Sequence, residues 1–369
     1  MELNFHDYEE EIKKIVFLKQ YKIDNDVLNN KEILLYGAGD LGHLAITLLR
    51  EYGLEPKYIV DRNAGKVNEL DGIPVISLTQ VSEVDKLSSL FLITICTVPY
   101  QPIYNLLKDS GINNVIQFYS YAYLKFPNLI SNGYLFDVAN NETSVKEVCR
   151  LLSHDEISLK HYLTFLYWKT ANMEHIFDDA PILSGKKYFG APCIPGASEA
   201  EVMIDCGSYH GQAIEKFIHY TNDKYKEIIA IEPDEESLLV CKKNFADSRI
   251  KYYNSAVSNF CGKAKFKSKL GYSSKLDENA FETKDVITID SINAVPTFIK
   301  LHIEGAELKA LQGAHETIKK YKPTVMCLAD HNDDGVCKIP LLLAEYGYKV
   351  YFYLHDYCGN TAVWYGVKK

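Results

Sequence analysis

The fold of this chain is decided by the stretch Val202-Met203-Ile204-Asp205-Cys206-Gly207-Ser208-Tyr209-His210-Gly211. A short apolar run ends in an acid and continues into a glycine loop. The following segment, which Gln212 opens, carries its apolar residues on one helical stripe. The order strand, tight loop and helix is typical of the first unit of a nucleotide-binding α/β domain.

The acid at the end of this strand predicts what the loop binds. Bare amides at a helix N-terminus attract phosphate, whereas the carboxylate of Asp205 repels phosphate and suits an ammonium group. The Asp-x-Gly-x-x-x-Gly spacing therefore favours S-adenosylmethionine over a dinucleotide. The residues expected at this cofactor are Asp205, Gly207, Ser208 and Gly211. The alternative interpretation is that these residues serve the geometry of the turn alone.

A second apolar run, 228–231, also ends in an acid, Glu232, and is stopped by Pro233. A carboxylate at this position can accept both hydroxyls of a ribose. We therefore expect Glu232 and Pro233 beside the cofactor. The alternative for Glu232 is a solvated strand end.

Strands and helices alternate almost to the end of the chain. Strands are expected over 202–206, 228–232, 250–254, 298–303, 324–329, 348–354 and 362–367, and helices near 212–221, 235–246, 307–320 and 335–346. The last two strands are predicted to form a hairpin. A mostly parallel sheet with an antiparallel last strand is typical of class I methyltransferases rather than of dehydrogenases.

A second fingerprint lies near the N-terminus. The run Gly37-Ala38-Gly39-Asp40-Leu41-Gly42 follows an apolar strand and precedes a helix, and Asp61 ends the next strand. This is the Gly-x-Gly-x-x-Gly pattern of a dinucleotide site in its required context. We expect a Rossmann-like domain over 1–125 that binds a nucleotide, NAD or a sugar nucleotide. A degenerate domain kept for packing or for dimerisation is the alternative.

The remaining chain divides into two parts. Helical periodicity and aromatic residues predict a helical bridge over 126–185, and the methyltransferase domain is expected over 186–369. The bridge is expected to pack on the front of that domain. Its aromatic residues are interpreted as core.

Composition excludes several classes of protein. The chain has 369 residues, 47% hydrophobic and 24% charged, which predicts a soluble globular protein of two domains. A net charge of −9 argues against a nucleic-acid partner. No apolar run approaches a membrane span, and Met1 to Gln20 does not resemble a secretory signal. Nine cysteines without a Cys-x-x-Cys pair indicate a reducing cytoplasm rather than a disulfide framework or zinc ribbon.

Polar residues alternate in a strand that should be buried on both faces. Lys300, His302 and Glu304 fall on one side of the strand expected at 298–303. His331 follows the neighbouring strand and is expected at the same edge. A carboxylate and an imidazole there could deprotonate a hydroxyl or hold a divalent cation that acidifies it. The alternatives are a Lys300–Glu304 salt bridge, a surface His331 and a structural role for His302.

Taken together, these motifs resemble the FkbM family of methyltransferases over roughly residues 200–331. The motifs are Asp205-Cys206-Gly207, Glu232-Pro233-Asp234, Asn254-Ser255-Ala256-Val257-Ser258, Thr288-Ile289-Asp290-Ser291-Ile292, Lys300-Leu301-His302-Ile303-Glu304-Gly305-Ala306-Glu307 and Leu311-Gln312-Gly313-Ala314. The resemblance implies S-adenosylmethionine-dependent O-methylation of sugars or related hydroxylated products. It also implies cofactor binding by Asp205, Gly207 and Glu232, with Ala256 and Val257 beside the adenine. The family usually has Lys-x-Asp-x-Glu-Gly, and His302 stands at the aspartate position.

Four lysines alternate at Lys263, Lys265, Lys267 and Lys269. On a strand they would share one face. They are interpreted as the protected face of an edge strand, or as an electropositive wall for an anionic substrate.

The sequence thus predicts a cytoplasmic methyltransferase that transfers the methyl group of S-adenosylmethionine to a hydroxyl of a sugar, sugar nucleotide or glycan precursor. Glu304 or His331 is expected to take the hydroxyl proton. Two alternatives stay open: an NAD- or sugar-nucleotide-binding enzyme that uses the N-terminal domain, and a non-catalytic binding module. A small-molecule or glycan partner is expected, and a homodimer is one expected assembly.

Overall fold

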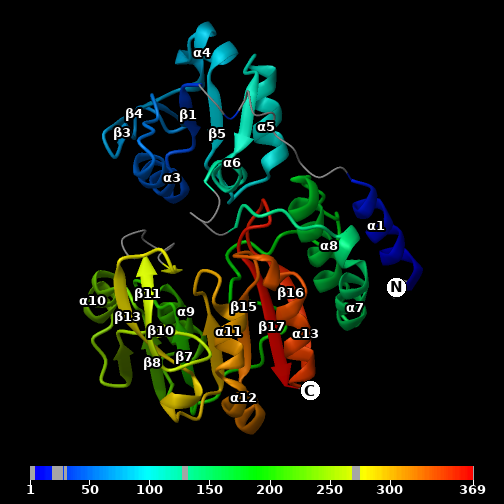
Figure 1. The fold of residues 1–369 in the computed structure, drawn as a ribbon, viewed down its shortest axis with the longest axis vertical. Helices are drawn as coiled ribbons and strands as arrows, with labels where there is room; N and C mark the ends of the chain where they lie inside the picture. Colours follow the sequence, from blue (N-terminus) through cyan, green and yellow to red (C-terminus); the bar gives the residue numbers. More distant parts are fainter. Residues whose placement is uncertain (1–4, 19–27, 29–30, 127–131, 268–274, 369) are drawn as a thin grey trace.

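The chain folds around two mostly parallel sheets that lie one above the other along its long axis (Figure 1). This computed structural model describes residues 5–18, 28, 31–126, 132–267 and 275–368. The mixed α/β fold class predicted from the sequence is confirmed. Among the described residues, no helix is long and apolar enough to span a bilayer.

The upper sheet has the strand order β3-β4-β2-β1-β5-β6. All its pairings are parallel except β3 with β4. Its strands are β1 (Ile33–Tyr36), β2 (Ile59–Val60), β3 (Glu69–Leu70), β4 (Ile73–Ile76), β5 (Leu90–Ile93) and β6 (Asn114–Gln117). Its helices are α3 (Asp40–Glu51), η1 (Leu78–Gln80), α4 (Glu83–Ser88), α5 (Tyr100–Asp109) and α6 (Phe118–Lys125).

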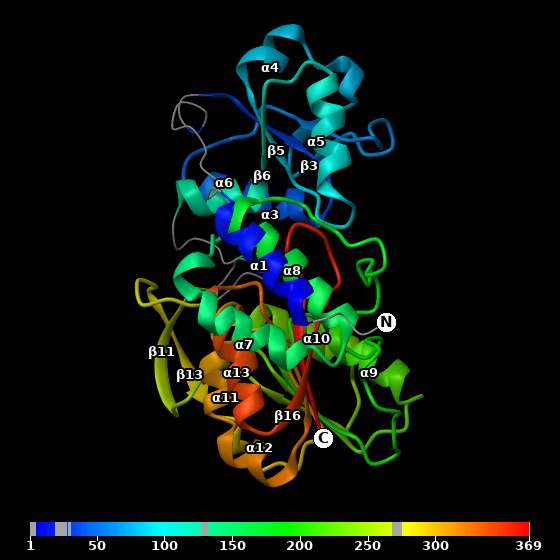
Figure 2. The same cartoon turned by 90° about the vertical axis from the view of Figure 1, so that its right-hand side faces the viewer.

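Three helices pack together beside the lower sheet (Figure 2). They are α1 (Phe5–Phe17), α7 (Glu142–Leu152) and α8 (Glu156–Ala171), with the short turn η2 (Ala139–Asn141) before α7. Buried Ile12, Val148 and Tyr162 join the same hydrophobic core as Phe352 and Trp364 of the lower sheet. Helix α1 therefore packs with the lower unit, although the sequence analysis grouped it with the first domain.

The lower sheet has the strand order β16-β17-β15-β14-β7-β8-β9. Strand β17 is antiparallel to both of its neighbours, and the other pairings are parallel. The strands are β7 (Val202–Cys206), β8 (Glu227–Ile231), β9 (Ile250–Tyr253), β14 (Phe298–Leu301), β15 (Thr324–Leu328), β16 (Tyr348–Leu354) and β17 (Ala362–Lys368). This is the arrangement that the sequence predicted for a class I methyltransferase.

Helices cover both faces of the lower sheet because its strands are apolar on both sides. Met203 and Ile228 pack with one group of helices, whereas the adjacent Ile204 and Ile229 pack with the other. The first group is α9 (Gln212–Tyr220) and α10 (Glu235–Asn244), and the second is α11 (Glu307–Gln312), α12 (His315–Tyr321) and α13 (Lys338–Glu345). Two short turns, η4 (Asp290–Ile292) and η5 (Asp333–Gly335), precede β14 and α13.

The single helix predicted at 307–320 is wrong, because α11 ends at Gln312 and α12 begins at His315. A Cβ atom at Gly313 would lie 2.2 Å from the carbonyl oxygen of Ser258. This close approach of two backbone segments requires glycine, which also favours a break in the helix.

A small four-stranded sheet, absent from the sequence prediction, lies beside the lower sheet and beneath the upper unit (Figure 1). Its order is β10 (Ala256–Val257), β13 (Glu282–Ile287), β11 (Gly262–Lys267) and β12 (Lys275–Leu276). Strand β11 lies between two neighbours, so its interpretation as an edge strand is wrong. Its lysines Lys263 and Lys265 are exposed, and Lys267 contacts Glu51 of α3 at 2.9 Å. Lys269 lies outside the described residues.

Candidate active site

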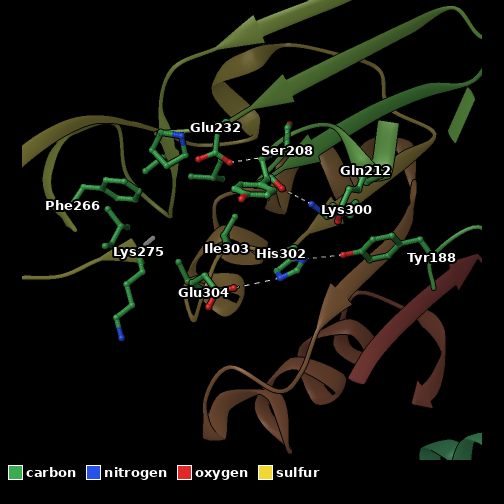
Figure 3. A pocket seen from close by; sticks show the side chains of 18 of the residues that line it. Tyr188, Ser208, Gln212, Glu232, Phe266, Lys275, Lys300, His302, Ile303 and Glu304 are labelled. Atoms are coloured by element: carbon green, nitrogen blue, oxygen red, sulfur yellow. Dashed lines mark hydrogen bonds and ion pairs between the residues drawn. The ribbon is translucent and has the colours of Figure 1, made fainter. Parts of the chain in front are cut away.

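A pocket with about 900 Å³ of empty space opens at the carboxyl ends of β7, β8 and β14 (Figure 3). Ligands of parallel α/β sheets bind at this edge. The residues predicted from the sequence that line it are Gly207, Ser208, Glu232, Pro233, Ala256, Val257, Lys300, His302 and Glu304. Segments distant in the chain therefore converge on one space.

Asp205, predicted to contact the cofactor, does not line this pocket. Its side chain is fully buried, and Oδ1 lies 2.8 Å from the ammonium of Lys300. The β7–β14 register places the two residues side by side. Lys300 also donates to the carbonyl oxygen of Gly207 at 2.6 Å. Asp205 thus fixes Lys300 through an ion pair, and Lys300 fixes the glycine loop through its hydrogen bond to Gly207.

Gly211 also lies outside the pocket lining. It precedes α9 with a φ of +93°, and a Cβ atom there would lie 2.2 Å from the ring of Phe245. Packing and backbone conformation therefore explain this glycine. By contrast, a Cβ atom at Gly207 would lie 1.9 Å from the carbonyl oxygen of His302, beside the pocket.

Glu232 is held rigidly at the pocket wall. Its carboxylate accepts hydrogen bonds from the backbone N–H groups of Tyr209 and Asp234, both at 2.9 Å. Burial raises the pKa of Glu232 despite these two bonds. The carboxylate is thus fixed beside the glycine loop, and its contact with a ribose stays a prediction.

Several apolar and aromatic residues that line the pocket were not predicted from the sequence. Tyr209 has a left-handed φ of 47° and stacks on His210, with ring centroids 3.7 Å apart. Phe266 and Leu276 reach the pocket from the small sheet. No local signal identified them, because the small sheet was not predicted.

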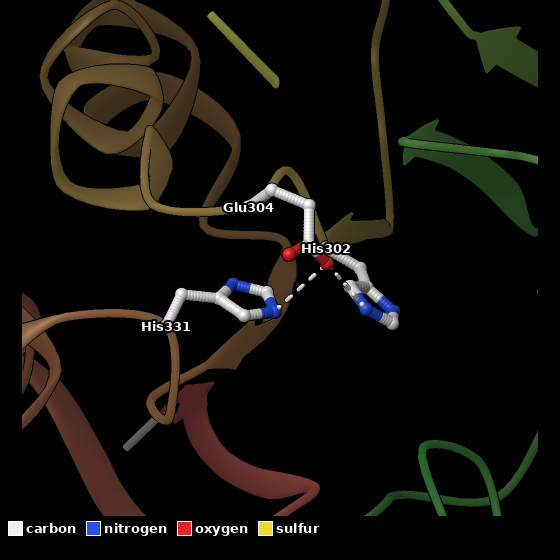
Figure 4. A group of neighbouring side chains, drawn as sticks. All are labelled: His302, Glu304 and His331. Carbon is white, nitrogen blue, oxygen red and sulfur yellow. Dashed lines mark ion pairs between the residues drawn. The ribbon is translucent and has the colours of Figure 1, made fainter. Parts of the chain in front are cut away.

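Several side chains that follow the carboxyl ends of β14 and β15 contact one another through hydrogen bonds and ion pairs (Figure 4). Glu304 Oε1 lies 3.1 Å from His331 Nε2 and 3.4 Å from His302 Nε2. His331 Nδ1 contacts Glu307 Oε1 at 2.6 Å, and the hydroxyl of Tyr188 lies 3.1 Å from His302 Nδ1. The convergence of His302, Glu304 and His331 agrees with the sequence prediction, whereas Tyr188 and Glu307 were missed.

Charge is distributed unequally between the two histidines. Burial, reinforced by the nearby Lys187, moves the pKa of His302 well below its usual value, so this ring is neutral. Burial also opposes the charge on His331, but Glu304 and Glu307 outweigh it and raise its pKa well above the usual value. A surface location for His331 is excluded, since its side chain is 3% exposed. His331 is an imidazolium between two carboxylates and is therefore not a free base.

The backbone turns sharply where these residues leave the sheet. Strand β14 ends at Leu301, earlier than the 303 predicted, and Glu304 has a left-handed φ of 51°. Glu307 accepts from the N–H groups of Ile303 and Gly305, each at 2.9 Å. A non-glycine residue in this conformation is uncommon, and such strain is frequent at functional sites.

A second pocket, with about 1500 Å³ of empty space, adjoins the first. Glu304 lines both pockets, whereas His302 lines the first and His331 the second. Polar and aromatic side chains dominate its wall, among them Tyr123, Tyr134, Asp277, Asn279, Asn332 and Asp333. The histidine–glutamate cluster therefore stands at the junction of the two spaces.

The N-terminal fingerprint lies in neither pocket. Asp61, expected at a ribose, accepts from the N–H of Ala38 at 2.8 Å, inside the glycine loop itself. A Cβ atom at Gly42 would lie 2.5 Å from the carbonyl oxygen of Gly37. A Cβ atom at Gly37 would likewise lie 2.5 Å from the side chain of Ile95. Contacts within the domain therefore account for Asp61, Gly42 and Gly37 without a ligand. Nucleotide binding by Gly37, Gly39, Gly42 and Asp61 stays a prediction.

The lower unit combines the strand order of class I methyltransferases with a pocket at the carboxyl ends of β7, β8 and β14. Residues 205–350 match the family model described as the methyltransferase FkbM domain. The resemblance drawn from the sequence motifs is therefore confirmed.

A solved structure has the same fold. A crystal structure of methyltransferase FkbM from Methylobacillus flagellatus matches with a TM-score of 0.70 and 20% identity, covering 99% of this chain and 100% of that one. A precorrin-6y C5,15-methyltransferase from Geobacter metallireducens gives a TM-score of 0.30 and 12% identity over 47% of this chain and 82% of that one, which carries no argument. No curated protein matches the chain.

Proposed function

We propose that the protein transfers the methyl group of S-adenosylmethionine to a hydroxyl of a sugar, sugar nucleotide or glycan precursor. The observation that carries this proposal is the pair of adjoining pockets with Glu304 on the wall of both. In the first pocket the fixed carboxylate of Glu232 suits the ribose hydroxyls. Ala256, Val257 and Phe266 offer apolar surface to the adenine.

The acceptor is assigned to the second pocket. Its tyrosines offer ring faces to a sugar, and its carboxylates and amides offer hydrogen-bond partners to several hydroxyls. A polyhydroxylated acceptor matches this lining better than an apolar one. The negative net charge of the chain gives no reason to expect nucleic acid.

The reaction needs little covalent chemistry from the protein. The acceptor oxygen forms a bond to the methyl carbon while the carbon–sulfur bond breaks, which leaves S-adenosylhomocysteine and a methyl ether. Bond formation to the methyl group makes the hydroxyl strongly acidic, so its proton can pass to the carboxylate of Glu304 although the pKa of that carboxylate is lowered. His331 orients this carboxylate. Holding donor and acceptor in line supplies most of the acceleration.

Calorimetric titration of the purified protein with S-adenosylhomocysteine and with NAD tests this proposal. We expect one equivalent of S-adenosylhomocysteine to bind and NAD to give no heat. Binding of NAD alone would assign the chemistry to the upper unit instead. Binding of neither ligand would identify a non-catalytic module. Methyl transfer to sugar nucleotides, followed by mass spectrometry, tests the acceptor class separately.

A further inference from the structure

We propose that His302, Glu304 and His331 bind one divalent transition-metal ion at the junction of the two pockets. The three side chains come from two loops that follow the neighbouring strands β14 and β15. Each can offer one ligand atom, and these atoms all lie within 4.8 Å of one another. Figure 4 shows both imidazoles directed at the same carboxylate oxygen.

The spacing of the ligand atoms suits a metal ion. Two ligands that each lie about 2.0–2.1 Å from one ion are roughly 2.8–3.0 Å apart in octahedral geometry and roughly 3.3–3.4 Å apart in tetrahedral geometry. The two Nε2 atoms lie 3.1 and 3.4 Å from Glu304 Oε1. The two imidazole nitrogens lie within 4.8 Å of each other, so rotation of the side chains must complete the coordination of the ion.

The Nδ1 atom of each imidazole has a hydrogen-bond partner that fixes the orientation of the ring, as is usual for metal-binding histidines. The Nδ1 atom of His331 contacts Glu307 at 2.6 Å, and the Nδ1 atom of His302 lies 3.1 Å from the hydroxyl of Tyr188. These contacts leave Nε2 of each ring directed inward, and His331 releases its Nε2 proton to solvent when the ion binds. Tyr188 and Glu307 are thus assigned as outer-sphere partners of the two ligands.

The donor set selects the kind of ion. Two imidazoles and one carboxylate suit Zn²⁺, Co²⁺ or Fe²⁺, whereas Mg²⁺ and Ca²⁺ prefer oxygen ligands. Three protein ligands leave further coordination positions open. Because Glu304 and His331 line the second pocket, a hydroxyl oxygen of the acceptor can occupy such a position. This last assignment rests on the proposed function, but binding of the ion does not.

Titration of chelator-treated full-length protein with Co²⁺, followed by visible absorption and calorimetry, tests the site. We expect one equivalent to bind, with competition by Zn²⁺ and none by Mg²⁺. His302→Ala and Glu304→Gln should abolish this binding. Tyr188→Phe should weaken it by about 10- to 100-fold, as is usual for loss of an outer-sphere partner. The matched control is His315→Ala, an exposed histidine on α12, which should leave binding unchanged.

Two outcomes would overturn the proposal: no stoichiometric Co²⁺ binding, or binding that survives both His302→Ala and Glu304→Gln. The side chain of His302 is 25% exposed, so its removal tests the site with little effect on packing, and circular dichroism checks the fold. Titration with S-adenosylhomocysteine in the same samples separates the two proposals. Metal binding without S-adenosylhomocysteine binding would retain the site and reject the methyltransferase function.

Discussion

Lys300 and Asp205 form an ion pair of 2.8 Å in the centre of the lower sheet, where their side chains are 3% and 0% exposed. They stand opposite each other on adjacent parallel strands. A charge buried without its partner strongly destabilises a protein, whereas a buried pair contributes little net stability. The pair therefore serves to position the glycine loop, because Lys300 also donates to the carbonyl oxygen of Gly207.

Lys300→Met should lower the free energy of unfolding by about 3–5 kcal/mol, since it leaves the Asp205 carboxylate uncompensated. The double variant Lys300→Met, Asp205→Leu should recover most of that loss. Urea denaturation followed by the fluorescence of buried Trp364 measures both. Equal destabilisation by the single and double variants would contradict the pairing argument.

Glu232→Ala should weaken binding of S-adenosylhomocysteine, since it removes a buried acceptor from the pocket wall. A hydrogen bond to a charged group contributes about 1.5–3 kcal/mol, so the dissociation constant should rise tenfold or more. Calorimetry measures the change. Glu236→Ala, an exposed position on α10, is the control. Similar affinity in the two variants would remove Glu232 from the cofactor site.

His331→Gln should change how stability depends on pH in metal-free protein. The folded-state pKa of His331 is raised, so its contribution is fully present below its unfolded pKa of about 6.5 and is lost as pH rises through the folded value. The pKa of Glu304 is lowered, mainly because the charge of His331 outweighs burial, so its contribution is present above about 4.3 and is lost in acid.

The stability difference between wild type and His331→Gln should therefore be largest between about pH 4.5 and 6.5 and should shrink at alkaline pH. Urea midpoints measured across this range check the sign. A difference that grows above pH 8 would show that His331 is neutral in the folded protein.

Gly207→Ala should cost more stability and more ligand affinity than Gly347→Ala. Both glycines have left-handed φ values, +78° and +80°, so both variants carry a similar backbone penalty of about 1 kcal/mol. Only at Gly207 would the new Cβ atom lie 1.9 Å from a backbone oxygen, that of His302. Thermal unfolding and S-adenosylhomocysteine titration distinguish the two, and equal effects would contradict the steric argument.

Long apolar runs made the lower sheet predictable. The bounds of β7 and β16 agree with the expected strands. Burial on both faces leaves a continuous hydrophobic signal in β7, and β16 is rich in aromatic and β-branched residues. Strand β13 escaped prediction since Glu282–Ile287 is charged and half exposed. Without β13 the small sheet was not predicted, and Phe266 was therefore not recognised as part of the pocket wall.

The candidate site was predictable residue by residue but not in its pairings. Glycines and acids at strand ends identified Gly207 and Glu232 as pocket residues. The partner of Asp205 was hidden, because it depends on the register between two strands far apart in the chain. Tyr188 and Glu307 lacked a periodic pattern, and only the three-dimensional arrangement brings them to the histidines.

The ion pair between Lys267 and Glu51 links the upper unit to the small sheet. Lys267 is adjacent to Phe266 on β11, and neighbouring residues of a strand point to opposite faces. One strand thus lines the first pocket on one side and contacts the end of α3 on the other. A displacement of the upper unit by several ångströms would break this ion pair, which is partly exposed and contributes at most about 1 kcal/mol. Through this strand the upper unit is tied to the wall of the first pocket, although none of its described residues lines that pocket.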